Sequence, residues 1–196
     1  MLPVLMTSCL LMLGLVTLAR AIEPGEHRAT ARNVIFMIGD GCGPAYVELG
    51  RGVKGAPLSL DPYLVGASQT AASDSRVTDS AASATALACG VQTRNEAIGV
   101  DTRGRAHRTL LEAAESCGRS TGLVATSRIT HATPAAFAAH VPHRDDEDAI
   151  AAQEVEQNIE LLLGAGARHF IPVASGGHRT DSRNLLDEQR RSRRHG

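Results

Sequence analysis

The sequence predicts an α/β fold built on a parallel β-sheet. Apolar runs rich in β-formers alternate with segments of helical periodicity, and glycine or proline punctuates the changes between them. The first run, residues 33–38, is apolar almost throughout, which is typical of a strand buried on both faces of a parallel sheet. Because strands and helices alternate along the chain, a parallel sheet is the most economical architecture.

Length and composition bound the class of protein. A chain of 196 residues favours one domain. It carries 20 Lys and Arg against 21 Asp and Glu, so it has no overall electrostatic attraction for nucleic acid or membranes. Aromatic residues make up only 3%, which argues against a base-stacking surface. The four cysteines, Cys9, Cys42, Cys89 and Cys117, follow no CxxC or zinc-finger spacing.

Residues 1–21 are expected to be a signal peptide. An apolar run to residue 18 is followed by Ala19-Arg20-Ala21, a small-x-small cleavage site. The run is too short for a comfortable membrane span, but no Lys or Arg precedes it, so an uncleaved anchor is the alternative. Export to the periplasm or the cell exterior would place the three remaining cysteines in an oxidising compartment, with at most one internal disulfide.

The first half of the mature chain is read from its local signals. Gly90 is suited to cap a helix that begins near Ser80, and Pro57 and Pro62 mark loops. The expected elements are a polar leader at 22–31, a strand at 33–38, a helix at 45–51, a strand at 63–67, the helix from Ser80, and a brief strand at 97–100.

The second half continues the alternation. Thr133 suits the N-cap and Pro134 the first position of a short helix over 135–139. The other expected elements are a helix at 109–117, a strand at 121–126, an amphipathic helix at 146–163, a turn at 164–168, a strand at 169–173 and a helix at 184–189. Residues 190–196 form a basic tail, read as solvated; a nucleic-acid patch is the less favoured alternative because the tail has no aromatic residue.

Two polar positions stand at the ends of expected elements. Asp40 follows the first strand between two glycines, where open α/β sheets place their ligands and where backbone and ligand approach closely. Asp79 and Ser80 begin a helix whose unpaired N–H groups and dipole favour negative charge, so a serine oxygen there could attack an anionic centre. The plain alternatives are an acidic turn residue and an ordinary N-cap, which composition alone would favour.

The sequence of residues 78–86, Thr-Asp-Ser-Ala-Ala-Ser-Ala-Thr-Ala, closely resembles the nucleophile motif of the alkaline phosphatases. Gly-Asp-Gly at 39–41, His-Ala-Thr-Pro-Ala-Ala at 131–136 and Arg144 also match, in the family's order. The resemblance runs from about residue 33 to residue 186. It implies an α/β parallel-sheet sandwich with helices on both faces, of which this chain is expected to hold an incomplete version.

The resemblance also implies an activity. Family members hydrolyse phosphate monoesters through a phosphoserine, which would form here on Ser80, and they use two Zn²⁺ sites and one Mg²⁺ site. By the match, Asp40 would ligate one zinc and reach the magnesium, and Ser80 would contact the same zinc.

The remaining matched residues would bind magnesium and phosphate. Thr133 would be a magnesium ligand through its hydroxyl, with His131 near the ion through water because magnesium prefers oxygen ligands. Arg144 would grip two phosphate oxygens with its planar guanidinium, and Asp79 would help to orient that arginine.

The family's other metal ligands lie downstream of the matched segment. Residues 22–189 are therefore expected to be the N-terminal portion of an alkaline phosphatase domain. The alternative is a truncated, inactive fragment, or a product that only binds phosphate or a partner. The leftover histidines show no zinc-like spacing with carboxylates; they are His27, His107, His169, His178 and His195.

Two further expectations complete the interpretation. A different kind of serine hydrolase is disfavoured because the chain has no GxSxG elbow and no evident Asp/His triad partners. Family members are commonly homodimers, so phosphate monoesters and a second copy are the expected partners, with no nucleic acid and no stable membrane span.

Overall fold

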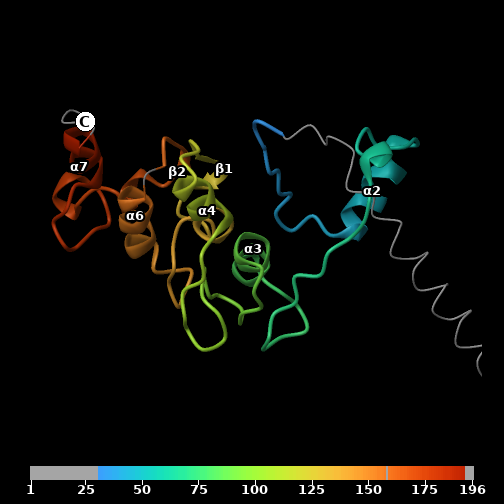
Figure 1. Cartoon of the computed structure of the whole chain (residues 1–196), viewed down its shortest axis with the longest axis horizontal. Helices are drawn as coiled ribbons and strands as arrows, with labels where there is room; N and C mark the ends of the chain where they lie inside the picture. The colour runs from blue at the N-terminus through green and yellow to red at the C-terminus, as the bar shows by residue number, and fades with distance from the viewer. Residues whose placement is uncertain (1–30, 158, 193–196) are drawn as a thin grey trace, which may run out of the picture. The chain divides into compact units, whose positions relative to one another are not determined.

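The computed structural model describes residues 31–157 and 159–192. The chain divides after Ile38 into two units, and every described helix and strand belongs to the second (Figure 1). The expected signal peptide, Cys9 and residues 193–196 of the basic tail lie outside the described residues.

The described chain contains six α-helices, three short 3₁₀ helices and two strands. The α-helices are α2 (Pro44–Lys54), α3 (Ser80–Cys89), α4 (Leu110–Ser116), α5 (Ala132–Ala135), α6 (Glu147–Glu156) and α7 (Leu185–Ser192). The strands are β1 (Gly122–Arg128) and β2 (Leu161–Ala165). The 3₁₀ helices are η1 (Asp61–Tyr63), η2 (Ala167–His169) and η3 (Val173–Ser175).

β1 and β2 pair in parallel, which confirms the predicted α/β class. Gly122 lies opposite Leu161 and Val124 opposite Leu163, and the register shifts before Arg128 pairs with Ala165. The crossover between the strands carries α5 and α6, the helical connection that parallel neighbours need.

One face of this sheet carries the core. Leu123 and Leu162 pack against a buried cluster in which Ala151 of α6 and Leu185 of α7 are fully buried. α6 and α7 lie side by side (Figure 1). On the opposite face, Val124 is 70% exposed, so in the described part of the chain the sheet is covered on one side.

Four predicted strands are wrong. Residues 33–38 and 63–67 form no strand among the described residues, and residues 169–173 run from the end of η2 to the start of η3 with a single bridge from Pro172 to Arg179. Residues 97–100 make only single bridges, Ile98 to Val141 and Val100 to Ala106. The physical reason is that β-propensity mainly measures how a side chain packs on a neighbouring strand, so an apolar run without a partner strand does not form one.

The predicted helix over 146–163 is also too long. α6 ends at Glu156, Gln157 is extended, and the three leucines from Leu161 enter β2. A short apolar run fits helical and strand patterns alike, and pairing with β1 decides the outcome here.

The cap predicted for α5 is shifted. The N-cap is His131, and Thr133 and Pro134 occupy the second and third helical positions. Proline is tolerated there because first-turn N–H groups have no intrahelical partner. The consequence is that the Thr133 side chain belongs to the first turn of α5.

Local signals predicted α3 and the start of α4 correctly. Gly90 caps α3 with φ +69°, and Thr109 and Glu112 form a capping box on α4.

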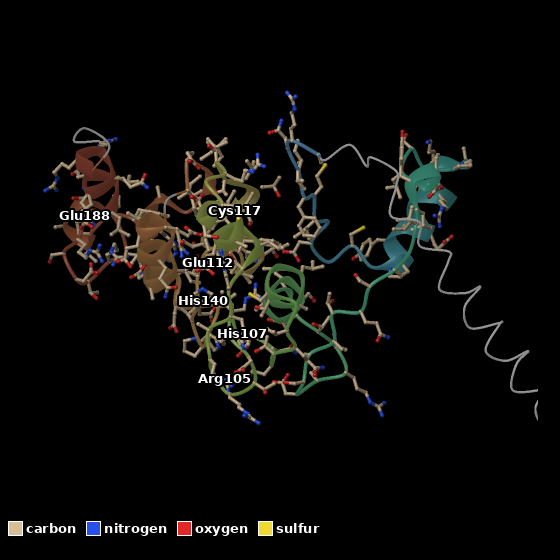
Figure 2. All side chains as sticks on the ribbon, in the orientation of Figure 1. Arg105, His107, Glu112, Cys117, His140 and Glu188 are labelled. Atoms are coloured by element: carbon tan, nitrogen blue, oxygen red, sulfur yellow. The ribbon has the colours of Figure 1, made fainter. Side chains whose placement is uncertain are left out.

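The side chain of His140 is held from two sides. Glu112 accepts a hydrogen bond from His140 Nε2 at 2.9 Å (Figure 2). His140 Nδ1 lies 2.8 Å from the carbonyl of Gly99, where a Cβ would come within 2.2 Å of backbone. His140 therefore anchors the segment that leads to Arg144.

Cys42, Cys89 and Cys117 are free thiols. Burial, with a smaller effect of Glu112, raises the pKa of Cys89 to about 11.

Among the described residues, no helix combines the length and apolarity that a membrane crossing requires.

Glu154 makes the folded chain sensitive to pH. Its side chain is fully buried, neither carboxyl oxygen has a hydrogen-bond partner, and burial, helped by nearby Glu147, raises its pKa to about 9. The folded chain thus keeps a proton that the unfolded chain loses near pH 4.5, and stability should fall as pH rises between these values, by at most about 1.4 kcal/mol per unit.

We expect Glu154→Gln to flatten this dependence, because the amide stays neutral at every pH. Urea unfolding at pH 5.5 and pH 8.5 measures the effect. Glu156→Gln, on the exposed side of the same helix, is the matched control. An unchanged pH dependence in Glu154→Gln would contradict the assignment.

Candidate active site

Three segments distant in sequence meet at the carboxylate of Asp40. Asp40 lies in the turn before α2, Ser80 is the first residue of α3, and Thr133 is in the first turn of α5. The Ser80 hydroxyl donates to Asp40 Oδ1 at 2.8 Å, and the Thr133 hydroxyl donates to Oδ2 at 2.7 Å. Both carboxylate oxygens are therefore engaged by hydroxyl groups.

Asp40 is held in its charged form. Burial would raise its pKa, but the hydrogen bonds from Thr133 and Ser80, with the nearby His131 and Arg144, outweigh burial and lower it below the usual value. The carboxylate is therefore ionised at neutral and alkaline pH.

The start of α3 positions Ser80. Asp79 is the N-cap, and its Oδ1 accepts from the backbone N–H of Ala82 at 2.8 Å. This bond fixes the first turn and leaves the Ser80 hydroxyl at the positive end of the helix dipole. Ala81 and Ala82 are buried beside it, so the small residues of the motif let α3 pack closely while Ser80 stays accessible.

Arg144 contacts both the N-cap of α3 and the N-cap of α5. Its Nη1 donates to Asp79 Oδ2 at 3.1 Å, and its Nη2 lies 3.0 Å from His131 Nε2. The guanidinium is only partly exposed, so these contacts restrict its orientation. A cation is thereby held next to the helix start that carries Ser80.

The contacts of His131 determine which ring nitrogen carries the proton. Arginine only donates, so Nε2 must accept and the neutral ring carries its proton on Nδ1. Burial, then the charge of Arg144, lowers the pKa of His131 and favours this neutral ring. Nδ1 is buried without a hydrogen-bond partner, 3.6 Å from Asp40 Oδ2. The site therefore holds an unpaired N–H donor beside the carboxylate.

Sequence reasoning missed the loop that clamps Asp79. The Asn95 side chain accepts from the backbone N–H of Asp79 at 2.9 Å, and the N–H of Glu96 donates to Asp79 Oδ2 at 3.1 Å. Glu96 has φ +70°, a strained conformation for a non-glycine residue, and strain of this kind clusters at functional sites. The polar stretch around these residues has no periodicity, so no sequence signal could have found them.

A second cluster was also missed. Asp148, His169 and His178 bring one carboxylate and two imidazoles together, and they form a candidate metal-binding triad. The leftover histidines show no zinc-like spacing with carboxylates in the sequence, but in the structure His169 and His178 both contact Asp148. His169 and His178 lie 21 and 30 residues from Asp148, intervals that match no ligand motif.

The donors around Asp40 suit a hard divalent cation. A carboxylate and two hydroxyls supply only oxygen atoms, the ligands that Mg²⁺ prefers. Zinc sites usually add nitrogen or sulfur ligands, and the one imidazole of this described network presents an N–H to the carboxylate. The residues thus fit magnesium directly, and for a zinc site they supply oxygen ligands only.

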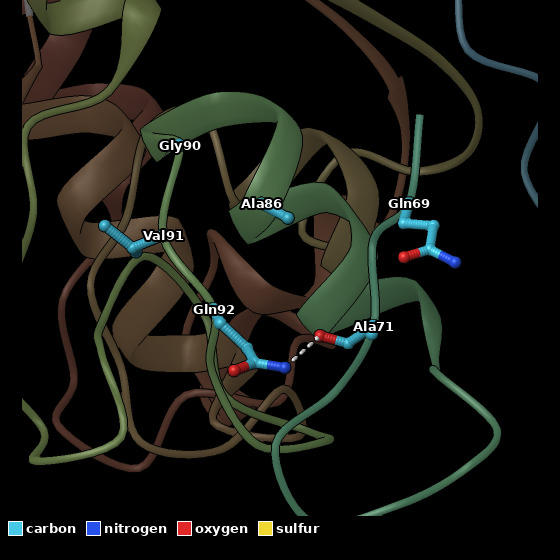
Figure 3. Close-up of a pocket in the computed structure, with 6 residues that line it drawn as sticks. All are labelled: Gln69, Ala71, Ala86, Gly90, Val91 and Gln92. Carbon is cyan, nitrogen blue, oxygen red and sulfur yellow. Dashed lines mark hydrogen bonds between the residues drawn. The ribbon is translucent and has the colours of Figure 1, made fainter. Parts of the chain in front are cut away.

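A pocket of ≈ 280 Å³ at the other end of α3 is chemically different (Figure 3). Its six lining residues are Gln69, Ala71, Ala86, Gly90, Val91 and Gln92. None of them titrates, and Gln92 donates across the pocket to the carbonyl of Ala71. The reactive side chains along α3 therefore lie at its N-terminal end and not at this pocket.

Comparison with known proteins points to one family. The family model described as alkaline phosphatase matches residues 31–195. The repressible alkaline phosphatase of Saccharomyces cerevisiae is 44% identical over 188 residues, which cover 86% of this chain and 33% of the yeast protein. Alkaline phosphatase 3 of Bacillus subtilis is 44% identical over 154 residues, covering 71% and 33%. The chain thus spans about a third of the length of these curated relatives.

Solved structures agree. Alkaline phosphatase from the Antarctic bacterium TAB5 is 40% identical with a TM-score of 0.58, covering 63% of this chain and 34% of that one. A histidine-to-aspartate mutant of it, solved with Mg bound in its M3 site, is 38% identical with a TM-score of 0.57, covering 62% and 34%. A cold-active alkaline phosphatase from Shewanella sp. is 38% identical with a TM-score of 0.65, covering 71% and 37%.

Proposed function

The chain belongs to the alkaline phosphatase family, and from this premise we propose that it carries the nucleophile and phosphate-binding part of a metal-dependent phosphomonoesterase. The observation that carries the proposal is the position of Ser80. Its hydroxyl lies at the start of α3, donates to Asp40 at 2.8 Å, and shares a network with the guanidinium of Arg144.

Ser80 acts as the nucleophile. Its Oγ loses its proton to solvent and attacks the phosphorus of a monoester, with Asp40 accepting the Ser80 hydrogen bond beforehand and so orienting the hydroxyl. The Oγ–P bond forms, the P–O bond to the alcohol breaks, and the leaving oxygen takes up a proton from solvent, which balances the one lost by Ser80. Water then attacks the phosphoserine; one of its protons restores the Ser80 hydroxyl, and inorganic phosphate is released.

Arg144 and the helix start hold the phosphoryl group. The guanidinium presents parallel N–H groups that match two phosphate oxygens, and its ion pair with Asp79 at 3.1 Å fixes its direction. The N-terminal N–H groups of α3 add positive potential on the same side. These groups stabilise the negative charge that spreads over the oxygens in the transition state.

Asp40, Ser80, Thr133 and His131 would hold the metals. We assign Asp40 and Ser80 to a zinc site, and Asp40 and Thr133 to a magnesium site. The Nδ1–H of His131 suits a water molecule near the magnesium better than direct ligation, because the N–H would have to be lost first. Bound metal supplies charge that lowers the pKa of the serine hydroxyl and stabilises the leaving oxygen. The Mg in one solved relative supports this metal dependence.

A second candidate function is phosphate binding without turnover. It is favoured by one observation: the described residues around Asp40 offer zinc no free imidazole lone pair. Arg144 and the start of α3 would still bind an anion.

Export and dimerisation are proposals as well. The signal-like residues 1–21 support secretion to the periplasm or the cell exterior. Homodimers are common in the family, and they are our expectation for the oligomeric state.

Hydrolysis of 4-nitrophenyl phosphate by residues 22–196 at alkaline pH, with zinc and magnesium, tests the function. Turnover that a chelator removes and that the two metals restore would support the phosphatase. Inorganic phosphate binding without turnover would support the second candidate. If neither is seen, both are wrong.

Arg144→Lys is expected to weaken phosphate binding and turnover together. Lysine keeps the charge but loses the fork, and hydrogen bonds to charged groups contribute about 1.5–3 kcal/mol, so kcat/KM should fall roughly tenfold to a hundredfold. The inhibition constant of inorganic phosphate should rise in parallel. Arg105→Lys, an exposed arginine paired with Asp101, is the control (Figure 2). Equal inhibition constants for inorganic phosphate in Arg144→Lys and the wild type would show that the Arg144 guanidinium does not bind the phosphate oxygens.

A further inference from the structure

The cluster of Asp148, His169 and His178 has no part in the mechanism above. We propose that these three residues bind a divalent transition-metal ion of the zinc class, at a site that shares no residue with the network around Asp40. Asp148 lies on α6, His169 ends η2, and His178 follows η3.

The ligand atoms are already close to the spacing that a metal requires. All three lie within 4.8 Å of one another. His178 Nδ1 is 3.3 Å from both oxygens of Asp148, and His169 Nδ1 is 2.8 Å from Oδ1. Tetrahedral ligands at about 2.1 Å from zinc are roughly 3.4 Å apart, so the contacts of His178 with Asp148 already match this spacing and the contact of His169 with Asp148 has to open to admit an ion.

The donor set selects the kind of ion. Two imidazoles and one carboxylate suit zinc and its neighbours, whereas Mg²⁺ and Ca²⁺ prefer oxygen ligands throughout. Three protein ligands leave a fourth position for water. A hollow of ≈ 320 Å³ gives that position room, and Asp145 and Asp146 also line it and make its potential more negative.

His169 is supported as metal-binding histidines usually are. It is only 4% exposed, and its Nε2 lies 3.2 Å from Glu147 Oε2. With Nδ1 on the metal, Nε2 can donate to this carboxylate, the outer partner that fixes the ring of a ligating histidine. Arg168, an exposed side chain, now donates to the same Nε2 at 3.0 Å and has to turn away for the pair to form.

The backbone around the ligands is also held together. The buried Arg179 donates to the carbonyl of Asp148 at 2.6 Å and to that of His169 at 3.1 Å. Its charge is balanced by Asp181. The N–H of His178 donates to the carbonyl of Arg168 at 2.8 Å. The segments that carry the ligands are therefore tied to one another before any ion arrives, which lowers the entropy that binding must overcome.

Zinc titration calorimetry and the visible spectrum of bound Co²⁺ test the site. His178→Gln is the variant of choice because this side chain is 65% exposed, so its loss leaves the fold intact. Asp40→Asn is the background in which metal binding at the phosphate site is removed. His107→Gln is the matched control, since His107 also faces a carboxylate, Asp101 Oδ2 at 3.0 Å, but without a second histidine.

We expect one zinc equivalent, and the Co²⁺ bands of a tetrahedral site, to persist in Asp40→Asn, and to remain when His107→Gln is added to it. Adding His178→Gln to Asp40→Asn should remove both. Zinc binding that survives in Asp40→Asn with His178→Gln, or that is absent from Asp40→Asn, would overturn the proposal. The readout is metal binding rather than turnover, so failure of the phosphatase proposal leaves this result unaffected.

Discussion

Ser80→Ala is expected to abolish metal-dependent hydrolysis of aryl phosphates, with a loss of at least about 10³-fold in kcat. Alanine removes the oxygen that attacks phosphorus but keeps helix α3, because the N-cap contact is made by Asp79. Intact mass spectrometry after incubation with substrate at low pH should detect a phosphorylated wild type and an unmodified variant.

Ser83→Ala is the matched control for this experiment. Ser83 lies on the same helix, and its hydroxyl contacts Thr70 and Thr78 rather than Asp40. Its loss should leave the turnover per folded molecule near the wild-type value. Turnover by Ser80→Ala equal to that of Ser83→Ala would sink the assignment of the nucleophile.

Asp40→Asn is expected to have the second large effect. The amide keeps the shape of the carboxylate and one acceptor oxygen, but it removes the charge that neutralises a cation, and its NH₂ group cannot accept a hydrogen bond from a hydroxyl. We expect kcat to fall by at least about 10²-fold, because activated nucleophile and charge stabilisation are lost together. Steady-state kinetics over a series of Mg²⁺ concentrations would also show a weaker dependence on the ion.

The control for Asp40→Asn is Asp61→Asn, which removes a carboxylate of equal charge that pairs with Arg51. Activity of the control should stay near that of the wild type. A variant at Asp40 that keeps the same Mg²⁺ dependence as the control would show that the carboxylate does not hold the ion.

The helices were predicted well where the signal is local. The start and end of α3 follow from Asp79 and Gly90, and the start of α4 follows from Thr109 and its capping box. Such caps act within a few residues, so the sequence contains the whole interaction. The strands failed because a strand depends on a partner elsewhere in the chain, as the apolar but unpaired residues 33–38 show.

The residues of the candidate site, like the strands, come together through contacts between distant parts of the chain. Asp40 and Thr133 are 93 residues apart, and no local rule would join them; only the order of motifs shared with a family placed them in one constellation. Asn95 and Asp148 belong to no such motif. Their roles follow from hydrogen bonds across the fold, which composition and spacing do not encode.

The half-buried thiol at the end of α3 has a consequence for chemical labelling. Cys42 and Cys117 are exposed, whereas the Cys89 thiol donates to the carbonyl of His107 and keeps its proton. A maleimide or disulfide reagent would therefore modify Cys89 more slowly than the two exposed cysteines. Since Cys89 and Ser80 stand at opposite ends of α3, an increase in the modification rate at this cysteine would report local opening at the far end of the helix that presents the serine.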